Sequence, residues 1–221
     1  MEKRVSFKSD GLTIEGLLHL PADAHEGLGV PGVVVCHPHP LYGGSMYNVV
    51  VEALCKSLEA SGFVALRFNF RGVGASEGSY DQGVGEVRDA KAALGFLKSI
   101  SSPKVAKVGI AGYSFGAYVA AHAAVESPDV DALALISPPL ALYDFGFLRA
   151  IRKPILMVLG DRDEFAGASI EELARIAASQ AGISLIEGAD HFWFGREEEV
   201  CDAVTRFFEE ALKLGDQARR S

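Results

Sequence analysis

Short apolar runs alternate along the chain with segments whose apolar residues recur at helical spacing. The run GVVVCHP, residues 32–38, is almost continuously apolar, which is typical of a strand covered on both faces. In residues 47–62, which follow, Val51, Leu54 and Leu58 fall on one face of a helix. A strand followed by a helix in this way is the repeating unit of a mainly parallel sheet.

The same pattern extends over the whole chain and predicts about eight strands and five or six helices. The expected strands are residues 4–9, 12–20, 32–38, 63–70, 107–113, 132–138, 154–160 and 183–188. The clearest expected helices are residues 47–62, 86–100, 114–127, 169–179 and 197–214. No repeat, low-complexity tract or linker interrupts this alternation. We therefore expect one α/β domain over residues 1–221, with an eight-stranded, mainly parallel sheet flanked by helices.

Composition and charge narrow the function classes. Hydrophobic residues make up 49% of the 221 residues, enough for one sizeable core. The net charge of −8 argues against a nucleic-acid surface. No apolar stretch approaches the roughly 18 residues of a membrane span, and the first residues lack the apolar core of a signal peptide. Three widely spaced cysteines indicate reduced, buried thiols. These features favour a cytoplasmic protein, and none of them supports a homodimer.

The pentapeptide GYSFG, residues 112–116, lies between an expected strand and an expected helix and matches G-x-S-x-G. Ligands in such sheets bind at the carboxyl ends of the strands, where this turn falls. Glycines two positions to either side of Ser114 allow a sharp turn that side chains would obstruct. The hydroxyl would then stand at a helix N-terminus, which favours an anion. We predict a nucleophilic serine, and the alternative is a structural turn.

A serine hydroxyl needs a base that removes its proton. His191, in GADHFWFGR, comes directly after the last expected strand and can reach Ser114 from the same edge of the sheet. His19 precedes the core strands and His122 lies inside a helix, so both are expected to be structural. Asp190, next to His191, should point in another direction.

The base in turn needs an acid that fixes its tautomer. GDRDEF, residues 160–165, ends a strand and offers Asp161, Asp163 and Glu164. We favour Asp163, because the chain needs a few residues to turn before an acid faces His191. Asp161 is then a turn residue, and Glu164 is the second choice. The order Ser, Asp, His along the chain is that of the α/β hydrolases.

An oxyanion hole would complete the site. One donor should be the N–H of Phe115, after the nucleophile, and the other should come from the loop after the third strand. That loop is HPHPLYGGSMYN, residues 37–48, in which the prolines have no N–H. The second donor is therefore His39 or Leu41, and we favour His39.

Two motifs suggest other chemistry less strongly. His37 and His39 could bind zinc only with a third ligand, and no ligand motif accompanies them. RGVGASEG, residues 71–78, lacks the third glycine of a dinucleotide-binding loop and is better explained as a tight turn. We expect no metal and no other cofactor.

Taken together, CHPHPLYGGSMYN, LRFNFRGVGASEG, GYSFGAY, GDRDEF and GADHFWFGR resemble the α/β-hydrolase superfamily. The combination is similar to small, lidless serine hydrolases related to dienelactone hydrolases and to X-Pro dipeptidyl-peptidase-like esterases. The resemblance implies a catalytic triad of Ser114, Asp163 and His191, with an oxyanion hole at Phe115 and His39. Dienelactone hydrolases proper use a cysteine nucleophile, so their substrate is not transferred to this chain.

The expected substrate size depends on whether a cap domain covers the site. Only residues 139–153 separate two expected strands where a cap domain would be inserted. An open site with aromatic neighbours suggests small or short-acyl esters, with Tyr42 and Trp193 as substrate contacts. Further aromatic candidates are Tyr143, Phe145 and Phe192. We expect a serine carboxylesterase. A peptidase or thioesterase would use the same residues, and a non-catalytic binding protein is the alternative from another class.

Overall fold

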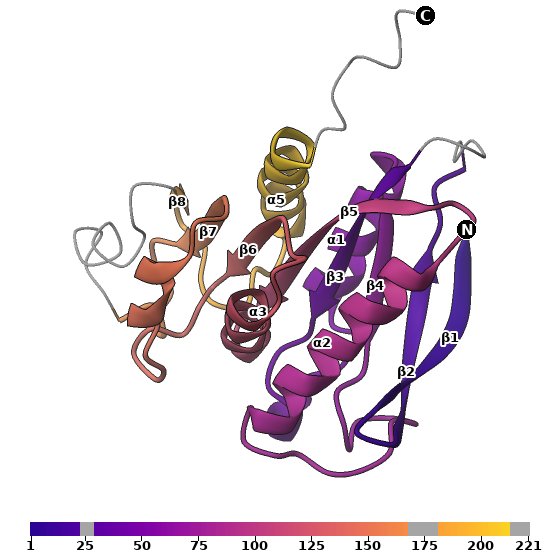
Figure 1. Cartoon of the computed structure of the whole chain (residues 1–221). Coiled ribbons are helices and arrows are strands. Elements are labelled where there is room, and N and C mark those ends of the chain that lie inside the picture. The colour runs from indigo at the N-terminus through magenta and orange to yellow at the C-terminus, as the bar shows by residue number, and fades with distance from the viewer. Residues whose placement is uncertain (23–28, 168–180, 213–221) are drawn as a thin grey trace, which may run out of the picture.

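Eight strands form one sheet in the computed structural model, which describes residues 1–22, 29–167 and 181–212 (Figure 1). Their order across the sheet is β1-β2-β4-β3-β5-β6-β7-β8. The two N-terminal strands pair antiparallel with each other, β2 pairs antiparallel with β4, and every other neighbouring pair is parallel. The strands are β1 (Glu2–Ser9), β2 (Leu12–His19), β3 (Val30–Cys36), β4 (Val64–Phe68), β5 (Val105–Tyr113), β6 (Ala132–Ile136), β7 (Ile155–Gly160) and β8 (Ala181–Ile186). The expected α/β architecture is confirmed.

Helices cover both faces of this sheet. The part of the chain that the structure describes has four α-helices: α1 (Val49–Ala60), α2 (Val84–Ser99), α3 (Phe115–Glu126) and α5 (Glu197–Ala211). α1 and α5 pack together on one face, and α2 and α3 lie on the other (Figure 1). The helix expected over residues 169–179 lies outside the described residues.

The sheet divides the hydrophobic core into two layers. Val34 and Cys36 of β3 pack in the layer beneath α2 and α3. Val33 and Val35, which alternate with them, pack in the layer beneath α1 and α5. Successive side chains of a strand point to opposite faces, so a strand buried on both sides must be apolar throughout. This burial explains the continuous apolar run in the sequence.

The parallel arrangement determines where loops gather. The carboxyl ends of β3, β5, β7 and β8 lie along one edge of the sheet, because these strands run in the same direction. The loops after them are residues 37–48, the turn at Ser114, and the segments around Asp163 and His191. Residues far apart in the sequence therefore meet at this edge.

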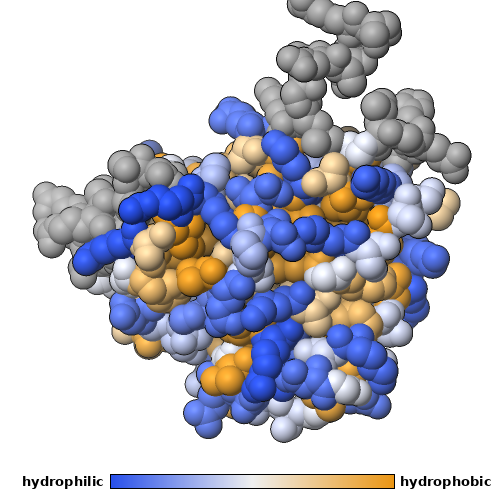
Figure 2. Space-filling view, in the orientation of Figure 1, coloured by the Kyte–Doolittle hydropathy of each residue, from blue (hydrophilic) through white to orange (hydrophobic). Residues whose placement is uncertain are grey.

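No cap domain is inserted between β6 and β7. Their connection contains one short 3-10 helix, Gly146–Ala150, in place of a domain-sized insertion. The face that carries α2 and α3 is mostly hydrophilic, with smaller apolar areas between polar side chains (Figure 2). Among the described helices, none has the length and apolar character needed to cross a membrane.

Candidate active site

Ser114 lies on a sharp turn between β5 and α3. Its φ of 56° and ψ of −121° are a conformation that residues other than glycine rarely adopt. A Cβ on Gly112 would collide with the carbonyl of Gly116, and a Cβ on Gly116 would collide with the carbonyl of Cys36. Both glycines of G-x-S-x-G are therefore required by close backbone approach. The turn exposes the Ser114 side chain partly while its neighbours are buried.

Three of the residues predicted from the sequence form one hydrogen-bonded chain. The Ser114 hydroxyl lies 2.9 Å from Nε2 of His191, and Nδ1 of His191 lies 2.9 Å from both carboxylate oxygens of Asp163. With Nδ1–H donating to the carboxylate, Nε2 is the nitrogen that can accept the serine proton. The hydroxyl of Tyr113 donates to the carbonyl of His191 at 2.7 Å and fixes that loop on β5. This arrangement can activate a serine as a nucleophile.

Asp163 is buried, yet its surroundings favour the ionised form. Burial alone would raise the pKa of this carboxyl group. Hydrogen bonds from His191 and Ser137, the charge of His191 and the N–H of Phe165 outweigh burial and hold the pKa of Asp163 below its ordinary value. The Phe165 N–H donates to it at 2.9 Å. An ionised carboxylate is thus available to stabilise an imidazolium on His191.

The other acidic candidates are used elsewhere. Asp161 accepts a hydrogen bond from the N–H of Gly188 at 2.6 Å and so links the loops after β7 and β8. Glu164 is exposed. Asp190 accepts from the N–H groups of Phe192 and Trp193, at 2.9 and 3.2 Å, and shapes the turn after His191. Of these acids, Asp163 is the one in contact with His191.

Trp193 does not line the site, which corrects its prediction as a substrate contact. Its side chain is fully buried in the core layer beneath α1 and α5. Its φ of 61° turns the chain so that the indole points inward, where Nε1–H donates to the Ser137 hydroxyl at 3.0 Å. Because Ser137 hydrogen-bonds Asp163, the tryptophan supports the acid from behind. The only signal for Ser137 in the sequence was its place directly after the strand now seen as β6.

The loop after β3 lies beside the N-terminus of α3. Leu41 N–H donates to Nδ1 of His39 at 3.2 Å, so it is already engaged. Within the described ranges, no hydrogen bond to another protein group uses the His39 N–H. Phe115 opens α3, where the first N–H groups have no acceptor inside the helix. The imidazole of His39 packs on the Phe115 ring, with centroids 4.7 Å apart.

The histidines of this loop have their ring nitrogens occupied. His37 Nδ1–H donates to the Pro38 carbonyl at 2.6 Å, and Nε2 accepts from Phe70 N–H at 3.1 Å. Burial lowers the pKa of His37 to about 4, so the ring is neutral at neutral pH. Both nitrogens of His39 are also hydrogen-bonded. In this arrangement the His37–His39 pair offers no free nitrogen to a metal.

Apolar side chains surround the mouth of the site. Tyr42 is 88% exposed and lies over His39, with ring centroids 4.9 Å apart. Further large apolar residues are exposed on the loops after β3, β6 and β8: Leu41, Tyr47, Leu142, Phe192 and Phe194. Tyr143 is half-buried and packs on Phe115. Phe145, a further aromatic candidate, is buried in the core and does not face the site.

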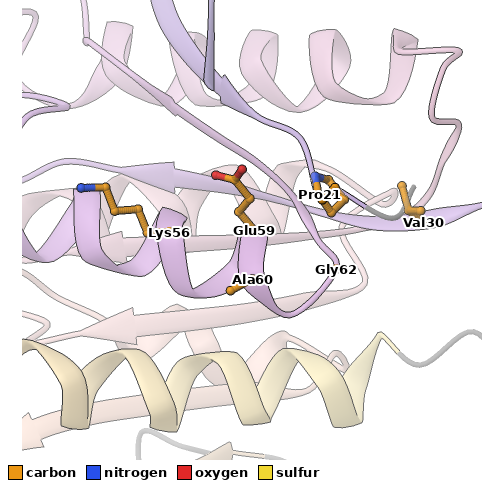
Figure 3. A pocket seen from close by; sticks show the side chains of 7 residues that line it. Pro21, Val30, Lys56, Glu59, Ala60 and Gly62 are labelled. Carbon is orange, nitrogen blue, oxygen red and sulfur yellow. The ribbon is translucent and has the colours of Figure 1, made fainter. Parts of the chain in front are cut away.

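A hollow of about 310 Å³ lies elsewhere on the molecule (Figure 3). Its lining includes Glu59 and Gly62 at the end of α1 and Val30 at the start of β3. It is therefore at the amino ends of the parallel strands, opposite the edge that carries Ser114. The hollow contributes none of the residues described above.

Comparisons with known proteins show the family to which the chain belongs. The model of the Dienelactone hydrolase family matches residues 14–214. The uncharacterized protein RP471 of Rickettsia prowazekii (strain Madrid E) is 40% identical over 186 residues, covering 80% of this chain and 78% of that protein.

Two solved structures share the fold over nearly the whole chain. An alpha-beta serine hydrolase homologue from Coxiella burnetii is 35% identical, with a TM-score of 0.81 over 92% of this chain and 96% of that one. XC6422 from Xanthomonas campestris, a serine hydrolase without lid, is 27% identical, with a TM-score of 0.81 over 95% of this chain and 94% of that one. The chain therefore belongs to the dienelactone hydrolase family and is an α/β hydrolase.

Proposed function

We propose that the protein is a serine carboxylesterase that acts on small or short-acyl esters. The observation that carries the proposal is the hydrogen-bonded chain from Ser114 through His191 to Asp163. In this family a cysteine can take the nucleophile's place, and here the position is a serine with a base at hydrogen-bond distance. The exposed apolar side chains around the mouth, with no cap between β6 and β7, support small uncharged substrates.

The mechanism follows from the positions of these groups. Ser114 Oγ attacks the ester carbonyl carbon as its proton passes to Nε2 of His191. Asp163 stabilises the resulting imidazolium. The N–H groups of Phe115 and His39 bind the negative charge that forms on the carbonyl oxygen. His191 then gives its proton to the departing alcohol, and an acyl group remains on Ser114.

Deacylation repeats these steps with water in place of the serine hydroxyl. His191 removes a proton from water, which attacks the acyl carbon, and the proton returns to Ser114 Oγ as the acid leaves. The proposal also assigns Tyr42, which is exposed beside His39, to contact with the substrate.

Hydrolysis of p-nitrophenyl esters from acetate to decanoate tests the proposal. Wild type should prefer the short esters, and Ser114→Ala should lower kcat by about 10⁴-fold or more. Ser99→Ala, at the exposed end of α2, is a matched serine control and should retain full activity. If Ser114→Ala is as active as wild type, Ser114 is not the nucleophile and the proposal is wrong.

A fluorophosphonate probe separates the alternatives. It labels an activated serine whatever the natural substrate is. Labelling of wild type without turnover of any ester would favour a peptidase or thioesterase. Absence of both labelling and turnover would favour a binding protein.

A further inference from the structure

The loop that carries the proposed oxyanion donor is built around His39. The His39 carbonyl accepts from the N–H groups of Tyr42 and Gly44, at 3.1 and 3.0 Å. Its Nδ1 accepts from Leu41 N–H at 3.2 Å. Three backbone N–H groups of the loop therefore depend on this residue, and its own N–H has no hydrogen-bond partner among the described residues. Contacts that hold the imidazole in place therefore also restrain the backbone of His39, including its N–H.

The imidazole is held on its other side by a residue from a distant loop. Tyr80, between β4 and α2, has its hydroxyl 3.1 Å from Nε2 of His39. The two rings also pack together, with centroids 4.9 Å apart. Tyr80 contacts Phe115 as well, at 5.9 Å between centroids. A single tyrosine thus touches both residues whose N–H groups form the proposed hole.

The hydrogen bonds fix the tautomer of His39. A backbone N–H can only donate, so Nδ1, which accepts from Leu41, carries no proton. The neutral ring then has its proton on Nε2 and donates it to the Tyr80 oxygen. Burial lowers the pKa of His39 and so favours this neutral form. The groups that face the ring are the aromatic side chains of Tyr42, Tyr80 and Phe115.

We propose that Tyr80 is a positioning residue of the oxyanion hole, which acts through the His39 imidazole to aim the His39 N–H at the reacting carbonyl oxygen. This inference rests on the proposed function. Tyr80 lies outside every motif that indicated catalysis, in the loop between β4 and α2 that also contains RGVGASEG. That loop is anchored by Arg71, whose guanidinium binds Asp89 at 2.8 Å. The anchored loop gives Tyr80 a fixed base from which to hold His39.

A double-mutant cycle on ester hydrolysis tests the proposal. Tyr80→Phe removes one oxygen and keeps the ring, and His39→Ala removes the imidazole but keeps the N–H. Tyr80→Phe should lower kcat about 10-fold with little change in KM, less than the loss of an entire oxyanion donor. In the His39→Ala background, Tyr80→Phe should have no further effect, because the two residues act as one unit. An equal loss in both backgrounds would overturn the proposal.

A transition-state analogue and a matched tyrosine sharpen the test. Affinity for a short alkyl trifluoromethyl ketone, which forms a tetrahedral oxyanion on the serine, should fall in Tyr80→Phe by the same factor as kcat/KM. Tyr118→Phe is the control, because Tyr118 also packs on Phe115 but its ring meets His122 and Tyr143 in place of His39. That variant should match wild type. An unchanged kcat in Tyr80→Phe would overturn the proposal.

The tautomer gives a readout that does not depend on activity. Nitrogen-15 NMR of the histidine side chains should show His39 with its proton on Nε2 at neutral pH in wild type, and a changed Nε2–H signal in Tyr80→Phe. A proton on Nδ1 would contradict the hydrogen bonds on which the proposal stands. Ser114→Ala, measured in parallel, distinguishes the two failures. If it stays active the proposed function fails, whereas loss of its activity with no effect of Tyr80→Phe refutes the role of Tyr80 alone.

Discussion

Asp163 couples catalysis to stability through its charge. Its pKa is lower in the folded protein than its ordinary value of 3.8, because hydrogen bonds outweigh burial. Ionised Asp163 therefore stabilises the fold above that value, and this contribution is lost as pH falls through the folded-state pKa. The difference in unfolding free energy between wild type and Asp163→Asn, from urea titrations at about pH 7 and about pH 3, should shrink at the lower pH. A difference that is independent of pH would contradict this.

The same substitution has an expected effect on turnover. Asparagine cannot stabilise an imidazolium and can favour the wrong tautomer of His191, so kcat should fall by about 10⁴-fold in Asp163→Asn. Asp161→Asn changes a neighbouring acid that does not contact His191 and should have a far smaller effect. Steady-state hydrolysis of p-nitrophenyl acetate measures both. Equal losses in the two variants would show that the choice between the acids is wrong.

The three cysteines are expected to be unreactive. Cys36, Cys55 and Cys201 are free thiols and all are buried. Burial raises the pKa of Cys201 to about 12 and raises the pKa of the other two thiols further. Since the thiolate is the reactive form, Ellman's reagent should react slowly with the folded protein and with all three thiols after unfolding. A fast-reacting thiol in the native protein would refute this expectation.

The sequence predicted the position of a residue well only where that residue lies close to the end of a strand. Ser114, Asp163 and His191 each follow a strand closely, so the edge of the sheet placed them together. The direction of a side chain two residues further on was not predictable. At Trp193 the backbone turn set by Asp190 reverses the side chain into the core. Tyr80 gave no signal, since only folding brings its loop against His39.

At the scale of elements, the approach of α3 to the end of β3 is a critical contact. A Cβ on Gly116 would collide with Cys36 and lie 2.6 Å from the carbonyl oxygen of His37. Gly116→Ala should therefore displace α3 or the oxyanion loop and lower both the thermal midpoint and kcat. Gly95, inside α2, has no atom within 4 Å of such a Cβ. Gly95→Ala should leave kcat unchanged and stabilise the protein by up to about 1 kcal/mol.

Calorimetry and ester hydrolysis on the two variants check this pair. Equal thermal midpoints for Gly116→Ala and wild type would show that the turn between β5 and α3 tolerates a methyl group. The comparison separates a loss of close packing from the general effect of adding an alanine to a helix.

Helix interiors were easier to predict from the sequence than helix starts. Apolar periodicity suggested that the second helix begins at residue 86, whereas α2 begins at Val84. Glu86 belongs to the first turn and accepts hydrogen bonds from the N–H groups of Asp81 and Gly83, both at 2.8 Å. This capping interaction buries a charged residue where periodicity gives no signal. The strands were predicted close to their observed bounds, and β4, β6 and β7 are buried on both faces.

Over the whole molecule, the two core layers share a single sheet. Leu97 of α2 belongs to one layer and Phe208 of α5 to the other. Both approach the sheet closely at a glycine: a Cβ on Gly32 would lie 3.0 Å from Leu97, and a Cβ on Gly109 would collide with the Phe208 ring. Because the strands carry both layers, a defect in one layer should weaken the other.

Unfolding should consequently be a single transition, and Trp193 provides the means to see it. It is the one tryptophan of the chain and is fully buried in the layer of Phe208. Leu97→Ala creates a cavity in the opposite layer and should cost about 2–5 kcal/mol of stability, with about 3–5 kcal/mol for Phe208→Ala. In urea, Trp193 fluorescence and far-UV circular dichroism should shift together in Leu97→Ala, as in Phe208→Ala. If the fluorescence midpoint of Leu97→Ala stayed at the wild-type value while the dichroism midpoint fell, the two layers would unfold independently. The active site depends on both layers. Asp163 and His191 lie beside Trp193, whereas His39 and Tyr80 pack on Phe115 of the other layer. Independent unfolding of the layers would therefore disrupt the active site in two separate steps.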